Sequence, residues 1–308
     1  MFVNILTQVI VLLILIMLGV VLTKFKMLSD TTVKQITDMV LLFVTPCVII
    51  KSFMREFDPS LTKKLLISFL ISILVHIIYI VISLLLIRHS DKKKEKVLRF
   101  AAIFSNCGFM AVPLLDAILD DMGVFYGTAY LAVFNIMIWS FGVFLMSGNK
   151  KEFFSLKKIL INPGIIGISI ALLVFFLNIP LHKAQIISQP INFMAGLNTP
   201  LPMIIIGYHL ANSNLFTALK SFRAVFSMLL KLVIFPLITL FGMYLCGIRG
   251  EVLVAITISA SAPTAAITTM FSSKFGADTE LSVSLVSLST VISILTIPII
   301  ITLAQLIA

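Results

Sequence analysis

Two stretches of this sequence place hydrogen-bonding side chains and a proline within long apolar surroundings. The first is FSNCGFMAVPLL, in which Asn106 and Gly108 precede Pro113, and the second is ISASAPTAAITTMF, which is centred on Pro263. Proline removes a main-chain donor and clashes with the carbonyl four residues earlier, so each proline predicts an interrupted helix. An unpaired main-chain group is costly in hydrocarbon, so we expect both interruptions to line a protein-walled or water-filled cavity.

The residues at these interruptions are suited to binding an anion without a fixed charge of their own. The residues that we expect to contact a ligand are Asn106, Gly108, Ser259, Ser261 and Thr264, and the expected helix breaks are Pro113 and Pro263. Partial positive charge at the N-terminal ends of half-helices adds attraction for an anionic group. One interrupted span is more often a packing feature, so the prediction depends on the matched pair.

Lys231, in SMLLKLVIFPLI, is the basic residue placed inside an apolar run. At 1.5 Å per residue it lies roughly 15 Å from the start of that run, which is close to the middle of a bilayer. Two interpretations stay open. The lysine attracts the anion from within the protein, or its side chain extends back to the cytoplasmic surface.

The sequence lacks the motifs of several other classes of protein. The sequence has no glycine-rich phosphate loop, no metal-type spacing of His, Cys and carboxylates, and no nucleophile motif, so we expect neither an enzyme nor a bound cofactor or metal. Basic residues form short loop clusters without interleaved aromatics, which argues against nucleic acid as a partner. The sequence places no carboxylate clearly at a membrane midplane, which favours an anionic substrate and leaves the coupling ion, a proton or sodium, open.

Composition predicts an all-α polytopic membrane protein. The chain has 308 residues, of which 60% are hydrophobic and 12% charged, whereas a soluble domain is about 45–50% apolar and about 25% charged. Apolar runs of about 20 residues, long enough to cross a bilayer as helices, recur along the chain. We predict ten transmembrane helices, over residues 3–23, 32–52, 65–88, 97–119, 123–146, 159–180, 190–211, 221–246, 251–272 and 281–305.

Charge predicts how these spans are oriented. Of the 23 Lys and Arg residues, 16 follow odd-numbered spans and 6 follow even-numbered spans, with Lys231 inside a span. Because basic residues concentrate in cytoplasmic loops, the odd-numbered loops are expected inside and both termini outside. The protein is therefore expected to be a multi-pass protein of the cell membrane.

An internal repeat is visible in the prolines. Thr45 and Pro46 in the second span correspond to Thr199 and Pro200 in the seventh, and Pro113 corresponds to Pro263. The repeat divides the chain into residues 1–149 and 150–308, each with five spans. Because five is odd, the second half enters the membrane from the opposite side, which makes the repeat inverted.

The segments SNCGFMAVPLL, SAPTAAITTMFSSKFGAD, TPCVIIKSF and ILTIPIIITL resemble the auxin efflux carrier family of membrane transport proteins, in the short prokaryotic form that includes malate and malonate permeases. The resemblance implies a fold similar to bile-acid symporters and sodium–proton antiporters, in which helices 4 and 9 cross at their broken midpoints beside the substrate. It also implies a scaffold of helices 1, 2, 6 and 7, a crossover transport domain of helices 3–5 and 8–10, a homodimer, and the plasma membrane of a prokaryote. Candidate scaffold contacts are Thr45, Pro46, Asn198, Thr199 and Pro200.

Together these features predict a secondary active transporter that moves small organic anions, as mono- or dicarboxylates, by alternating access within a lipid bilayer. Two alternatives stay open. One is a channel-like or ligand-sensing membrane protein that keeps the transporter fold, and the other is a carrier of auxin-like indole acids.

Overall fold

The computed structural model describes residues 2–148 and 163–308, which are almost entirely helical. Within these ranges there is no β-strand, only one isolated β-bridge. The helices of the first half are α1 (Phe2–Lys24), α2 (Asp30–Met39), η1 (Val40–Val44), α3 (Thr45–Phe53), α4 (Pro59–Leu86), α5 (Lys92–Ile103), η2 (Cys107–Ala111), α6 (Val112–Met137), η3 (Ile138–Gly142) and α7 (Val143–Ser147). Those of the second half are α9 (Pro163–Phe176), η5 (Leu181–Lys183), α10 (Gln185–Gly196), α11 (Pro200–Ala211), α12 (Phe216–Leu219), α13 (Phe222–Leu229), η6 (Leu230–Ile234), α14 (Phe235–Leu245), α15 (Gly250–Ser261), α16 (Ile267–Lys274) and α17 (Thr279–Ile307).

Six helical segments of the described chain are long and apolar enough to cross a membrane, so the chain is a polytopic membrane protein. They are Ile5–Lys24, Asp30–Phe53, Pro59–Leu86, Cys107–Ser147, Phe222–Leu245 and Thr279–Ile307. The fourth contains 41 residues, about 60 Å of helix or twice the hydrocarbon thickness. It is divided at Asp120, which has non-helical angles (φ 53°, ψ −154°), between predicted spans 97–119 and 123–146. The total of ten spans and the inverted repeat stay predictions, and the start of predicted span 159–180 lies outside the described residues.

Proline shapes three of the long segments in the same way. Pro46, Pro113 and Pro236 each lie in the first turn of an α-helix that directly follows a five-residue π-helical segment, η1, η2 and η6 respectively. A proline cannot donate to the carbonyl four residues earlier and its ring crowds that carbonyl. Widening the preceding turn to π geometry relieves this conflict, so the helix continues without a break.

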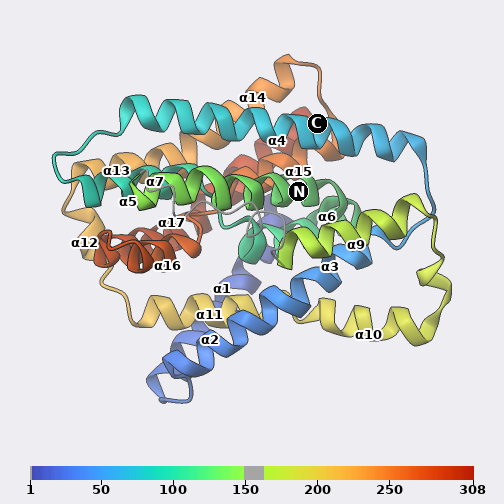
Figure 1. Ribbon diagram of the computed structural model, residues 1–308, viewed down its shortest axis with the longest axis horizontal. Coiled ribbons are helices and arrows are strands. Elements are labelled where there is room, and N and C mark those ends of the chain that lie inside the picture. The colour runs from blue at the N-terminus through green and yellow to red at the C-terminus, as the bar shows by residue number, and fades with distance from the viewer. Residues whose placement is uncertain (1, 149–162) are drawn as a thin grey trace.

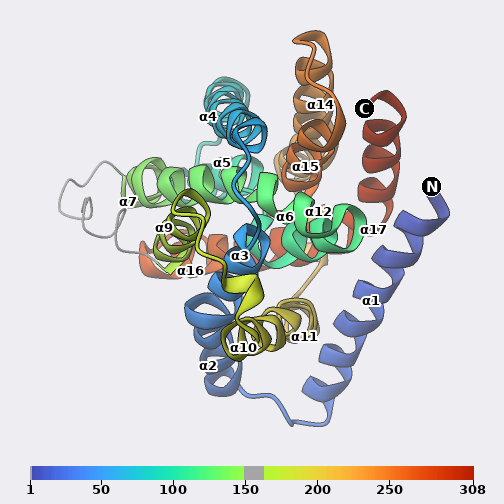
Figure 2. The same cartoon turned by 90° about the vertical axis from the view of Figure 1, so that its right-hand side faces the viewer.

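The helices pack as two groups. In the first, α1 packs against α11, and α3 packs against α9 and α10; α10 and α11 lie in the lower part of Figure 1. In the second, α15 packs against α6, α14 and α17, and α4 packs against α5 and α6. The groups meet where α1 contacts α17 (Figure 2) and where α6 contacts α3 and α9.

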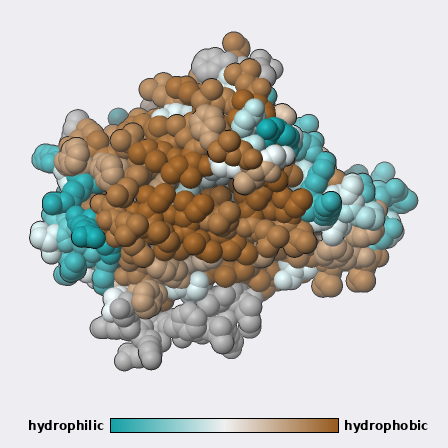
Figure 3. Space-filling model, turned by 90° about the horizontal axis from the view of Figure 1, so that it is seen from above, coloured by the Kyte–Doolittle hydropathy of each residue, from teal (hydrophilic) through white to brown (hydrophobic). Residues whose placement is uncertain are grey.

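Helix α4 shows how the sequence suits a lipid surrounding. Its residues Leu66, Leu70 and Leu74 form a stripe that is more than half exposed, whereas Ser68, Ser72 and His76 are fully buried. This pattern is the reverse of a soluble amphipathic helix, because in lipid the polar side chains must find partners inside the protein. Figure 3 shows the corresponding surface, on which a broad hydrophobic region separates hydrophilic patches at the two ends.

Candidate functional site

Two interrupted helices meet inside the second group and bond to each other through their main chains. Helix α5 ends at Ile103 and α15 ends at Ser261, and Ser105 and Thr264 form an antiparallel β-bridge between the segments that follow. The Asn106 N–H donates to the Pro263 carbonyl over 2.7 Å, and the Ala265 N–H donates to the Phe104 carbonyl over 2.9 Å. Each interruption thus satisfies main-chain groups that the other leaves without a helical partner. We call this pair of segments, residues 104–106 and 262–266, the crossing.

The first interruption does not lie at the proline that predicted it. The non-helical residues are Phe104, Ser105 and Asn106, whereas Pro113 follows the π-helical turn η2 inside continuous helix. In the second half the expectation and the structure coincide, because Pro263 lies within the non-helical segment. The difference arises because a π-helical turn accommodates Pro113 without loss of helix.

Thr264 is held by two further contacts from neighbouring helices. Its N–H donates to the Ser289 hydroxyl of α17 over 3.2 Å, and its hydroxyl donates to the Ala101 carbonyl of α5 over 3.1 Å. Thr264 itself is 1% exposed. The hydroxyl that the sequence assigned to ligand contact therefore joins the segment before α16 to α5 in this conformation.

Lys231 is fully buried and reaches both sides of the crossing. Its ammonium donates to the Ser105 hydroxyl over 2.6 Å and to the Ala260 carbonyl, in the last turn of α15, over 3.0 Å. The side chain therefore extends into the protein and not back to a membrane surface. A cation suits this position, because the last carbonyls of a helix carry partial negative charge.

A small network of aromatic and polar side chains surrounds this lysine. The Ser105 hydroxyl also shares a hydrogen bond with the Tyr130 hydroxyl over 3.0 Å, and the His76 ring lies 4.7 Å from the Tyr130 ring, centroid to centroid. His76 Nδ1 is 2.7 Å from the Ser72 carbonyl, and its Nε2 has no partner among the described residues. The Lys231 ammonium also lies 6.0 Å from the centre of the Tyr79 ring. Neither Ser105 nor Tyr130 stands out in the sequence, because a serine and a tyrosine in apolar runs are common.

Ser259 and Ser261 are turned toward their own helix. The Ser259 hydroxyl donates to the Ala255 carbonyl over 3.0 Å and the Ser261 hydroxyl to the Thr257 carbonyl over 2.6 Å. Both are bonds from a residue to the carbonyl four positions earlier, which satisfy a hydroxyl in an apolar surrounding. A ligand would have to compete with these bonds.

Two buried amides are incompletely paired. The Asn106 and Asn198 side-chain NH₂ groups have no hydrogen-bond acceptor among the described residues, although the residues are only 6% and 3% exposed. The Asn198 oxygen accepts from the Thr45 hydroxyl over 3.3 Å, which joins the two Thr-Pro segments. Buried donors of this kind are rare, and each needs an explanation such as a water or a ligand.

The crossing faces the first group of helices through an apolar seam. Phe109 of η2 belongs to a buried cluster with Val40, Val44, Ile205 and Tyr208, and Ala266 and Leu197 pack against it. Gly108 precedes Phe109 in η2, and a Cβ placed there would meet only a Leu131 methyl at 3.8 Å. Asn106 and Asn198 are therefore attached to opposite walls of one seam. Pro46 and Pro200 begin the helices on the first-group wall, beside Thr45 and Thr199.

An all-helical chain with several apolar spans and two interrupted helices joined inside it is typical of a membrane transport protein. A family model described as membrane transport protein matches residues 4–154 and 151–301, which together cover nearly the whole chain. The chain therefore belongs to this family, the auxin efflux carrier family, which confirms the resemblance. Members of the family are transporters and not enzymes. No curated protein matches the chain significantly.

Proposed function

We propose that the protein is a secondary active transporter of small organic anions, as mono- or dicarboxylates, in the plasma membrane of a prokaryote. The observation that carries this proposal is the pair of buried amide donors, Asn106 and Asn198, that lack acceptors on opposite walls of the seam. A carboxylate offers several acceptor sites, which is what donors of this kind require.

The electrostatics of the crossing support an anion over a cation. Helices η2 and α16 begin at the crossing without a side-chain cap, so their positive dipole ends lie there. Lys231 lies behind the crossing, where its protonated form adds positive charge, and its described contacts include no carboxylate. A buried cation site would require an acidic ligand.

The arrangement in two groups supports transport by alternating access. The crossing group, α4–α7 and α13–α17, would move past the group formed by α1–α3 and α9–α11, which correspond to the proposed transport and scaffold domains. Because the described seam is mainly apolar, displacement would break few hydrogen bonds. The proposal includes a homodimer and coupling to a proton or sodium.

The test is transport by purified protein in liposomes, measured as currents on a solid-supported membrane with a set of carboxylates, pH and sodium being varied. Asn106→Asp keeps the shape but replaces the free donor with an anion, so carboxylate currents should fall by about tenfold or more. Asn212→Asp, which introduces the same charge at an exposed helix end, should retain them.

Other outcomes would overturn the proposal. Flux that is not stimulated by substrate on the opposite side would favour a channel, and ligand binding without flux would favour a sensor. Currents restricted to indole acids would contradict the assignment of small mono- or dicarboxylates.

A further inference from the structure

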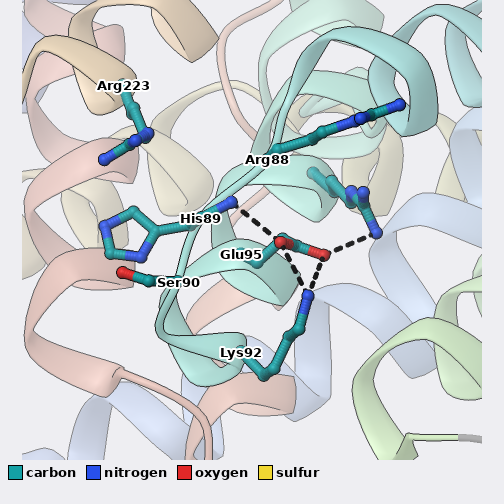
Figure 4. Close-up of a pocket in the computed structure, with 7 residues that line it drawn as sticks. Arg88, His89, Ser90, Lys92, Glu95 and Arg223 are labelled. Atoms are coloured by element: carbon teal, nitrogen blue, oxygen red, sulfur yellow. Dashed lines mark hydrogen bonds and ion pairs between the residues drawn. The ribbon is translucent and has the colours of Figure 1, made fainter.

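A polar pocket opens where α4 meets α5 and faces the start of α13. Its basic side chains are Arg88, Lys92, Arg99 and Arg223, and its one carboxylate is Glu95 (Figure 4). These residues come from two distant parts of the chain and lie at one end of the long helix α4. The loops that carry them are predicted to be cytoplasmic.

Glu95 neutralises only part of this charge. Its carboxylate pairs with Arg99 over 2.9 Å and Lys92 over 3.2 Å, and it accepts from the His89 N–H over 2.8 Å. Burial opposes ionisation of Glu95, but these donors outweigh burial and lower its pKa below the ordinary 4.5, so it stays charged. Arg99 also donates to the Ile87 carbonyl. Lys92 and Arg99 are thus engaged.

Arg88 and Arg223 keep their charge available. Neither guanidinium has a hydrogen bond or ion pair within residues 2–148 and 163–308. Figure 4 shows Arg223 reaching from α13 toward His89, with Ser90 beside the His89 ring and Glu95 on the other side. The Asp91 N–H donates to His89 Nδ1 over 2.9 Å, which leaves Nε2 as the donor nitrogen of a neutral ring. Arg223, His89 and Ser90 thus bring three donors to the lining of one pocket, and donors of this kind suit a phosphate.

An apolar groove continues from the same two arginines. Leu86, Ile87, Phe222 and Phe226 line it together with Arg88 and Arg223. The Phe222 and Phe226 rings are nearly parallel, with centroids 6.5 Å apart, and Phe222 is 83% exposed. An exposed phenylalanine beside an unpaired arginine, at the end of a membrane helix, is suited to an amphiphile.

We propose that this pocket and groove bind one anionic phospholipid. Its phosphate would lie among Arg223, His89 and Ser90, with Arg88 at the rim, and an acyl chain would follow Phe222 and Phe226. Basic pockets between membrane helices favour such head groups. A soluble phosphate would use the pocket alone and leave the adjoining groove without a role. This inference is independent of the transported substrate.

The test is the affinity of purified, detergent-solubilised protein for phosphatidylglycerol, measured by native mass spectrometry against zwitterionic phosphatidylcholine. Phosphatidylglycerol should bind about tenfold more tightly or better, and the double variant R88Q/R223Q should weaken it about 30-fold. The variant K24Q/K26Q removes the same charge from the same predicted side and should leave the affinity unchanged. Equal affinities of wild type and R88Q/R223Q would overturn the proposal.

A second comparison separates the lipid from its head group. Phe222→Ser changes an exposed side chain that is not needed for folding, and it should weaken the binding of phosphatidylglycerol several-fold. Free glycerol phosphate should fail to displace the lipid at comparable concentrations. If it displaced the lipid equally well, the pocket would be a site for soluble phosphates and the assignment to a phospholipid would be wrong.

Discussion

Pro263 has two roles at the crossing, one through its ring and one through its carbonyl. The ring cannot supply the N–H that would continue α15 by bonding to Ser259, and the carbonyl accepts from the Asn106 N–H. The ring therefore keeps the segment extended while the carbonyl fixes the partner segment.

Replacing Pro263 with alanine should restore a continuous helix from α15 into α16. The two main-chain bonds of the crossing would then be lost. At about 1 kcal/mol each, their loss corresponds to a factor of roughly 30 in the population of the intact crossing. We expect substrate currents in liposomes to fall by about that factor, with normal membrane insertion. Pro298→Ala, in the uninterrupted helix α17, is the control and should retain transport. Wild-type currents from Pro263→Ala would mean that the interruption is not needed.

At Lys231, the free energy gained from hydrogen bonds is nearly offset by the cost of burying the ammonium. Its two hydrogen bonds contribute about 1.5–3 kcal/mol each, and burying an ammonium costs several kcal/mol in return. Lys231→Met removes both terms, so the melting temperature in detergent should move by only a few degrees.

Transport by Lys231→Met should nevertheless fall by about tenfold or more, because Ser105 and Ala260 are no longer joined. Lys274→Met, at the end of α16, removes the same charge away from the crossing and should behave like the wild type. A large drop in melting temperature with retained transport would assign Lys231 to stability alone.

The sequence predicts which residues are near the crossing better than it predicts their partners. Asn106, Pro263 and Thr264 do come together, since polar residues and a proline in apolar runs have few other places to lie. Ser289 and the Ala101 carbonyl as partners of Thr264 were not predictable. They depend on the alignment of three helices, which residue types alone do not specify.

At the scale of elements, the contact between α1 and α11 depends on two glycines. A Cβ at Gly207 would lie 2.1 Å from the Ile16 carbonyl oxygen, and a Cβ at Gly19 would lie 2.4 Å from the Ile204 carbonyl oxygen. Neither oxygen can move without moving its helix. Glycine is therefore required here for close approach, as in many membrane helix pairs.

Gly207→Ala should separate α1 from α11 and destabilise the protein by about 1–3 kcal/mol. Gly242→Ala is the matched control, because α14 has open space at that position. It should be neutral or stabilise the helix by up to about 1 kcal/mol. Melting temperatures of both variants in detergent measure the difference. Equal values would show that the two helices adjust freely.

The elements also show where a prediction from sequence reaches its limit. Apolar runs indicate both ends of α1 and α17 closely, because length and hydropathy determine a membrane helix, whereas α4 begins at Pro59, well before the predicted start at residue 65. The π-helical turns η1, η2 and η6 were not predicted. A proline signals a conflict with the preceding carbonyl, but whether the helix breaks or widens depends on the helices packed around it.

At the scale of the whole molecule, orientation in the membrane is the prediction most directly open to measurement. Cys246 follows α14 and is exposed, whereas Cys107 is buried and Cys47 lies within a predicted membrane span. Since loops after even-numbered spans are predicted to be outside, Cys246 should be the cysteine reached from the medium.

A membrane-impermeant maleimide should therefore label the protein in intact cells, and Cys246→Ser should lose that labelling. If labelling required permeabilised cells, the predicted orientation would be wrong and Cys246 would lie on the cytoplasmic side. The fold and the crossing would be unaffected by that result, since neither depends on which side is cytoplasmic.

Hydrogen exchange at the two main-chain bonds of the crossing reports whether the segments separate during the transport cycle. The amide protons of Asn106 and Ala265 are held by carbonyls of the opposite segment, so they exchange with deuterium only when the segments separate. If the group moves as a rigid unit, both amides stay protected during turnover while residues bordering the seam exchange faster. If the half-helices open individually, these two amides are the first to exchange.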